Sequence, residues 1–142
     1  MSDFKLDSFL PYQLSVLAAQ VSREFSAIYR ERFGISVSEW RVVAHLSQTD
    51  EPVSVREIFQ KVDMDKSKVS RAAAKLESRG FVVKTQNKTD GRLVELKLSA
   101  AGRELIREMA PIAREYEKQI LSQLGEQESE FSAALETLLA GK

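Results

Sequence analysis

Residues 65–80 read DKSKVSRAAAKLESRG, and residues 81–99, directly after them, read FVVKTQNKTDGRLVELKLS. If 66–79 form a helix, apolar side chains recur at spacings of three and four and make one stripe that faces a core. Asp65 precedes this helix as an N-cap, and Gly80 follows it where a left-handed residue is favoured. The stretch therefore predicts one well-bounded helix, whose apolar stripe is Val69, Ala72, Ala73 and Leu76.

The face of this helix opposite the stripe is basic and carries small side chains. At 100° per residue, Ser67, Arg71 and Ser78 point away from the stripe, and Lys68 and Lys75 flank it. Small side chains let a helix approach the DNA major groove closely, and long cations beside them reach phosphates or guanine edges. A solvated surface helix is the alternative interpretation. The candidate DNA contacts on this helix are Lys66, Ser67, Lys68, Ser70, Arg71 and Lys75.

The next segment has the pattern of a β-hairpin. Residues 81–83 and 93–98 are rich in β-branched and apolar side chains, and the polar loop between them contains the turn-forming pair Asp90-Gly91. A hairpin beside a recognition helix is a wing, and its alternative is a surface hairpin with ordinary solvating charges. The basic helix next to it favours the wing. Its candidate DNA-binding residues are Lys88, Asp90 and Arg92.

Two capping boxes precede the basic helix in the chain. Ser36 and Glu39 predict a helix start that continues to about residue 47, and Ser54 and Glu57 predict a shorter helix to about residue 62. Only residues 62–64 separate this short helix from the basic helix. Two helices joined by so tight a turn have the spacing of a helix-turn-helix.

Composition excludes several classes of function. A chain of 142 residues with no cysteine has no disulfide, no cysteine-ligated zinc and no thiol-based sensor. His45 is the one histidine, which argues against a histidine-rich metal site, and we expect no metal and no cofactor. The sequence has neither a secretory leader pattern nor an apolar run of membrane-spanning length, so we expect a cytoplasmic protein with no membrane partner.

The formal net charge is zero, but the charge is unevenly distributed. Residues 65–92 contain eight basic and three acidic side chains, a local charge of +5, so the remainder of the chain sums to −5. A basic patch on an otherwise acidic protein is the electrostatic pattern expected of a nucleic-acid-binding surface.

The two ends of the chain predict long helices with more apolar surface than a small DNA-binding domain covers. One helix is expected at 10–33, ended by Gly34, and another from 100 to about 124, with a kink or break at Pro111. The last segment, 126–139, is expected to bury four side chains. They are Phe131, Leu135, Leu138 and Leu139.

These patterns predict a mainly α protein with a small β-hairpin wing, an α+β winged helix-turn-helix. We expect an N-terminal arm and dimerisation helix in 1–33, the DNA-binding domain in 35–98 and dimerisation helices in 99–142. A second copy is the simplest partner for the terminal helices, and a monomeric bundle is the alternative.

The chain resembles the multiple antibiotic resistance regulator (MarR) family of winged-helix transcription factors. The matching stretches are 35–43 (ISVSEWRVV), 65–71 (DKSKVSR), 76–82 (LESRGFV), 90–92 (DGR) and 94–102 (VELKLSAAG). The segment 90–92 is similar to the D-x-R wing of that family. The resemblance implies a homodimeric regulator, usually a repressor, that leaves its pseudo-palindromic operator when a small phenolic or aromatic carboxylate ligand binds.

The resemblance also implies roles for single residues. Arg92 would enter the minor groove, and Asp90 would orient it through a charge-assisted bond. An effector site between the DNA-binding and dimerisation parts makes Tyr12, Arg41 and His45 candidate ligand-binding residues, with ordinary polar packing as the alternative. A winged-helix module that binds proteins instead of DNA is the second hypothesis. The sequence contains no common catalytic motif, so we expect no enzyme.

Overall fold

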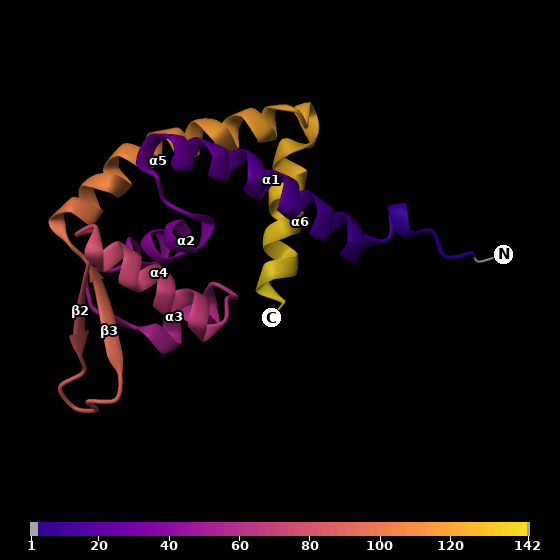
Figure 1. Ribbon diagram of the computed structural model, residues 1–142. Coiled ribbons are helices and arrows are strands. Elements are labelled where there is room, and N and C mark those ends of the chain that lie inside the picture. Colours follow the sequence, from indigo (N-terminus) through magenta and orange to yellow (C-terminus); the bar gives the residue numbers. More distant parts are fainter. Residues whose placement is uncertain (1–2, 142) are drawn as a thin grey trace. The chain divides into compact units, whose positions relative to one another are not determined.

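The computed structural model describes residues 3–141 and divides them into two compact units, the first ending at Arg107 and the second beginning at Glu108. Most of the secondary structure lies in the first unit (Figure 1). Its elements in chain order are η1 (Leu6–Ser8), α1 (Leu10–Phe33), α2 (Val37–Leu46), β1 (Val53–Ser54), α3 (Val55–Lys61), α4 (Lys66–Ser78), β2 (Val82–Gln86), β3 (Val94–Leu98) and the start of α5 (Ala100–Ser122).

Local signals set the boundary between α1 and α2. Gly34 follows α1 in the left-handed conformation (φ 65°), and its N–H donates to the carbonyl of Arg30. The Ser36 side chain then accepts from the N–H of Glu39 at 3.1 Å, and the Glu39 carboxylate accepts from the N–H of Ser36 at 2.9 Å. Both halves of the predicted capping box are therefore formed.

The helix-turn-helix consists of α3, a tight turn and α4. The Ser54 hydroxyl caps α3 by accepting from the N–H of Glu57 at 3.1 Å. The Glu57 carboxylate lies 3.6 Å from the Lys61 ammonium and 3.9 Å from His45 Nε2. In the turn, Asp63 has a positive φ of 54°, which side-chain-bearing residues adopt rarely.

The hairpin forms as predicted and gains a third strand. β2 and β3 are antiparallel, with Val82 opposite Leu98 and Gln86 opposite Val94. The two-residue strand β1 pairs with the other edge of β3, so the strand order is β1-β3-β2. So short a strand has no periodicity of its own, and its pairing with β3 cannot be inferred from the local sequence. The fold is mainly α with a small antiparallel sheet, which confirms the predicted winged helix-turn-helix class.

The core of the first unit lies between α2, α3, α4 and the sheet. The predicted stripe of α4 is buried along its length, with Val69 and Leu76 fully inaccessible. Glycine at position 102 lets the start of α5 approach the hairpin, because a Cβ there would lie 2.1 Å from the carbonyl oxygen of Phe81. The other large side chains buried in this unit include Tyr29, Ile35, Val42, Val43, Leu46, Ile58 and Leu96.

The second unit contains the rest of α5, η2 (Gly125–Gln127) and α6 (Glu128–Ala140). α5 continues through Pro111, so the predicted break is wrong, and the alternative of a kink stays a prediction. Pro111 has no N–H to donate to the carbonyl of Arg107. The boundary between the two units falls directly after Arg107. Gly125 ends the helical segment in the left-handed conformation, with φ of 57°.

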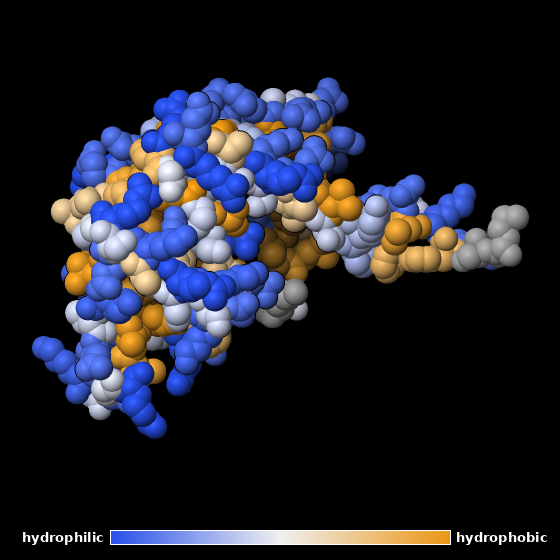
Figure 2. Space-filling model, in the orientation of Figure 1, coloured by the Kyte–Doolittle hydropathy of each residue, from blue (hydrophilic) through white to orange (hydrophobic). Residues whose placement is uncertain are grey.

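Apolar side chains remain exposed in both units. In α6 the side chains expected to be buried are exposed: Leu138 is 57% exposed and Leu139 65%. That expectation is wrong for the single chain. In the first unit the apolar N-terminal arm and the first half of α1 are also exposed, visible as orange atoms on the segment at the right of Figure 2. Within residues 3–141, no helix is long and apolar enough to cross a membrane.

Candidate nucleic-acid interface

α4 presents a polar, basic face opposite its buried stripe. Asp65 caps the helix, because its carboxylate accepts from the N–H of Lys68 at 2.8 Å. Gly80 follows with φ of 80°, as predicted for the C′ position. The six candidate DNA contacts of this helix are all exposed: Lys66, Ser67, Lys68, Ser70, Arg71 and Lys75.

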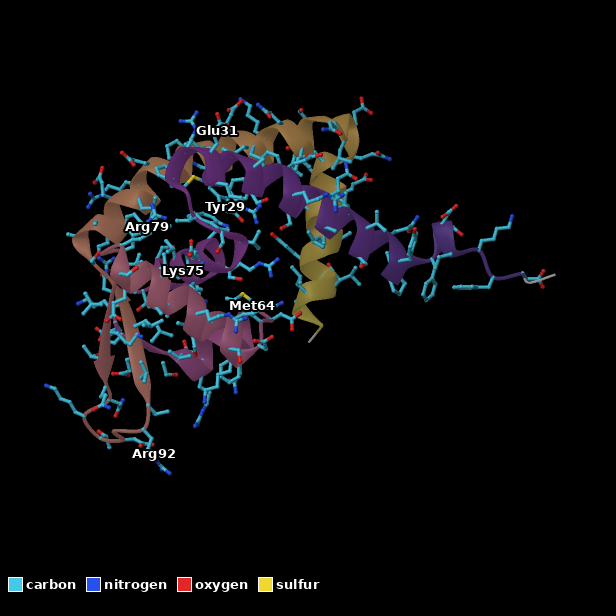
Figure 3. All side chains as sticks on the ribbon, viewed as in Figure 1. Tyr29, Glu31, Met64, Lys75, Arg79 and Arg92 are labelled. Atoms are coloured by element: carbon cyan, nitrogen blue, oxygen red, sulfur yellow. The ribbon has the colours of Figure 1, made fainter. Side chains whose placement is uncertain are left out.

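The tip of the wing is organised by two side-chain caps. The Asn87 carbonyl Oδ1 accepts from the N–H groups of Thr89 and Asp90, each at 2.8 Å. Asp90 Oδ1 in turn accepts from the Arg92 backbone N–H at 3.1 Å and from Arg92 Nε at 3.2 Å. The Arg92 side chain is nevertheless 92% exposed, at the loop end of the hairpin in Figure 3. Asp90 thus restrains the guanidinium while leaving it open to solvent.

One groove brings the helix and the wing together. It has a volume of about 260 Å³ and is lined by α3, α4 and the hairpin. Lys66 and Ser70 contribute from α4, and Arg92 contributes from the wing. Two of the six predicted contacts on α4 and one of the three at the wing therefore share one concave surface. Figure 2 shows hydrophilic atoms over the wing tip.

The same groove includes two cations that the sequence prediction missed. Arg56 reaches it from α3, and Lys84 reaches it from β2. Lys84 counted toward the local basic charge but had no assigned role, and it lies 3.5 Å from the Glu77 carboxylate. Arg56 lies inside the second capping box, and the local sequence there did not predict which surface its side chain would face. Only the packing of α3 against α4 places it at the groove.

A second groove, of about 250 Å³, lies between the start of α2 and α4. From α2 it is lined by Ser36 and Ser38, and from α4 by Lys68, Arg71 and Lys75. The basic face of α4 is thus bordered on one side by the wing groove and on the other by the start of α2. Lys88 is exposed at the wing but does not line either groove.

The three candidate effector residues lie on two helices, α1 and α2. Arg41 is exposed and His45 half-buried on successive turns of α2. Tyr12 is 39% exposed near the start of α1. His45 Nε2 lies 3.9 Å from the Glu57 carboxylate of α3.

An aromatic cluster joins α1 to α2. The Tyr29 ring stacks on Trp40 with ring centroids 5.5 Å apart, and Phe25 meets both rings edge-on. Burial raises the pKa of the Tyr29 hydroxyl, although Arg30 and Arg41 act in the opposite direction. Tyr29 therefore stays neutral up to a higher pH than a free tyrosine. The sequence predicted the helix at 10–33 but had not identified this cluster.

Comparisons with known proteins agree with this geometry. A sequence model of the MarR family matches residues 33–93, from the end of α1 to the wing. The HTH-type transcriptional regulator YdgJ of Bacillus subtilis (strain 168), itself uncharacterized, is 28% identical over 117 residues, 82% of this chain and 68% of the relative.

Two solved structures match nearly the whole chain. A MarR/EmrR family transcriptional regulator from Acinetobacter sp. ADP1 has 30% sequence identity and a TM-score of 0.82, over 97% of this chain and 96% of the other. The MarR family regulator SPO1453 from Silicibacter pomeroyi DSS-3 has 27% identity and a TM-score of 0.82, over 97% and 98% of the two chains.

Proposed function

This chain belongs to the MarR family of transcriptional regulators, and we propose that it binds a pseudo-palindromic DNA operator as a homodimeric repressor. The observation that carries the proposal is the shared groove. Lys66 of α4 and Arg92 of the wing line one groove, which suits a duplex whose major and minor grooves are contacted together. The solved structure of S. aureus MepR in complex with DNA has the same fold, with a TM-score of 0.79 at 18% identity over 94% of this chain and 98% of that one.

The residues have distinct proposed roles. α4 enters the major groove, where its small side chains allow close approach. Arg92 enters the adjacent minor groove, and Asp90 holds it by the bond to Nε without touching DNA. Lys88 and the missed cations Arg56 and Lys84 contact phosphates. The contacts proposed for the major groove and its phosphates are Lys66, Ser67, Lys68, Ser70, Arg71 and Lys75.

The proposed homodimer is supported by the exposed apolar surface at both ends of the chain. Leu10, Leu14 and Leu17 on α1 are each more than 40% exposed, as are Leu138 and Leu139 on α6. Several exposed apolar side chains on one helix favour a protein interface there. A two-fold dimer presents two copies of α4 about one helical turn of DNA apart, roughly 34 to 36 Å.

The proposed effector is a small aromatic or phenolic compound. NadR, solved in complex with 4-hydroxyphenylacetate, has the same fold, with a TM-score of 0.80 at 23% identity over 99% of this chain and 96% of that one. Tyr12, Arg41 and His45 remain the proposed ligand-binding residues. Adding 4-hydroxyphenylacetate to the protein–operator complex tests this part: release of DNA supports it, and an unchanged affinity removes this compound as an effector.

A mobility-shift titration at several salt concentrations tests DNA binding. If a dimer neutralises six to ten phosphates, affinity falls roughly 10³ to 10⁵-fold between 50 and 200 mM salt. Arg92→Ala should lower the affinity further without changing the fold, and Arg32→Ala, which removes an exposed cation of α1, is the matched control. A flat salt response, or no binding to any duplex, would favour the protein-interaction module instead.

A further inference from the structure

The segment directly after the recognition helix is tied to the end of another helix. Residues 79–81 leave α4 and enter the hairpin. Arg79 is the C-cap residue of α4, and its backbone N–H donates to the carbonyls of Lys75 and Glu77. Its side chain lines neither of the two grooves at the basic face of α4.

The Arg79 guanidinium binds the end of α1 with two hydrogen bonds. Nη2 donates to the carbonyl of Phe33 at 2.6 Å, and Nη1 donates to the carbonyl of Gly34 at 3.0 Å. The last carbonyls of a helix have no hydrogen-bond donor within the helix and carry its partial negative charge. A guanidinium supplies both the donors and the positive charge that these carbonyls lack. The guanidinium also lies 5.0 Å from the centroid of the Phe81 ring, at the start of the hairpin.

The same segment is held from a second side by the start of α5. The Ser99 hydroxyl donates to the carbonyl of Gly80, and the Ser99 N–H donates to the carbonyl of Phe81 at 3.0 Å. Gly102 packs on that Phe81 carbonyl so closely that a Cβ has no room. These contacts fix the backbone of 79–81, so the Arg79 side chain connects a fixed point on α4 to a fixed point on α1.

We infer that Arg79 is a positioning residue for operator binding, which sets the direction of α4 and the wing relative to α1. The inference rests on the proposed function. α1 is 24 residues long, about 36 Å at 1.5 Å per residue, and its exposed apolar half lies at the end opposite Arg79. α1 therefore links the proposed dimer contact to the recognition helix, and Arg79 is the side chain that closes this link. It acts on DNA recognition without touching DNA.

The test compares operators of different half-site spacing. DNA fragments bound by the wild-type protein are selected, and the recovered operator is remade with one base pair inserted or removed at its centre. Each change shifts the half-sites by about 3.4 Å along the axis. Arg79→Gln should lower affinity for the original operator about fivefold to tenfold. The loss of affinity caused by inserting or removing a base pair should also be smaller for this variant than for the wild type, by a similar factor. Arg79→Lys keeps the charge but loses the two separate donors of the guanidinium. Its operator affinity should lie between those of the wild type and Arg79→Gln.

Salt dependence separates positioning from direct contact. Loss of a phosphate contact reduces the slope of log affinity against log salt by about 1 per side chain, hence about 2 per dimer. Arg71→Gln should show that loss, and Arg79→Gln should keep the wild-type slope. All binding is measured well below the melting temperature of each variant, so that reduced stability alone does not alter the affinity of the folded protein.

The outcomes are distinct. A wild-type protein that selects no DNA, or DNA without paired half-sites, refutes the proposed homodimeric operator binding itself. If the wild type discriminates spacing and both Arg79 variants do so equally well, the positioning role is refuted while the proposed function stands. A shallower salt slope for Arg79→Gln would also overturn it, by making Arg79 a DNA contact.

Discussion

Two helices of the same length, α4 and α6, differ in how much of their apolar surface is buried in the single chain. Each has 13 residues and four or more apolar side chains. In α4 the apolar residues are covered, with Leu76 fully buried. In α6 no residue is buried, and Leu138 is 57% exposed.

The N-termini of the two helices also differ in capping. Asp65 caps α4 with a side-chain hydrogen bond, whereas Gln127 at the start of α6 makes no such bond. α4 is thus specified by local signals and by burial within its own unit. α6 has no buried residue in the single chain, so burial within that chain contributes little to its stability. The proposed DNA contacts of α4 and the wing lie within one unit of a single chain, whereas the apolar side chains of α6 are exposed in that chain.

Truncating the buried stripe of α4 should have the largest effect. Leu76→Ala removes a fully buried side chain and leaves a cavity, so we expect the free energy of unfolding to fall by about 2 to 5 kcal/mol. Urea denaturation followed by circular dichroism measures it. A loss below about 1 kcal/mol would mean that the core around α4 collapses onto the gap and specifies the helix less tightly than its burial indicates.

The same truncation in α6 should act on association instead. Leu138→Ala removes a side chain that is 57% exposed in the chain, so its effect within one chain should stay within about 0.5 kcal/mol. If α6 is covered by a second copy, the dimer dissociates about tenfold more readily, because each copy loses apolar contact. Analytical ultracentrifugation over a dilution series measures the dissociation constant. An unchanged constant would place Leu138 outside the proposed interface.

Removing the cap of α4 should have a smaller effect. Asp65→Ala leaves the N–H of Lys68 without its acceptor and should cost about 1 kcal/mol of unfolding free energy. Gln127→Ala is the matched control in α6, where no cap bond is lost, and should change nothing measurable. Thermal melts of both variants at one protein concentration compare them. Equal losses would contradict the assignment of the capping bond as the source of the difference.

The local sequence predicted the elements that signal their own ends. The bounds of α1, the complete box at Ser36, the cap at Asp65 and the left-handed Gly34 and Gly80 were all readable, because each feature depends on residues within one turn. The features that depend on distant packing were not. They include strand β1, the direction of Arg56 toward the groove, and the uninterrupted course of α5 through Pro111.

In the candidate site, too, the residues on periodic elements were predicted from the sequence, and those that depend on distant packing were not. Its cations on α4 and at the wing followed from helical and strand periodicity, and Asp90 bonds Arg92 as the resemblance implied. The local sequence assigned no role to Arg79, because its partners Phe33 and Gly34 lie more than forty residues earlier in the chain. The effector residues stay a prediction, since no local pattern specifies a cavity built from several elements.

The smallest expected effect concerns the residues that lead into the two helices. A left-handed residue precedes each: Asp63, with φ of 54°, before α4, and Gly125, with φ of 57°, before α6. An L side chain is strained there, and glycine is not, although glycine loses more chain entropy on folding. Asp63→Gly should therefore stabilise the protein by about 0.5 kcal/mol, and Gly125→Asp should destabilise it by a similar amount. A Cβ at position 125 would meet nothing within 4 Å, so Gly125→Asp tests the backbone conformation of η2 without a steric clash of the Cβ. Differential scanning calorimetry compares them, and destabilisation by Asp63→Gly would show that the Asp63 side chain contributes more to the turn than its φ costs.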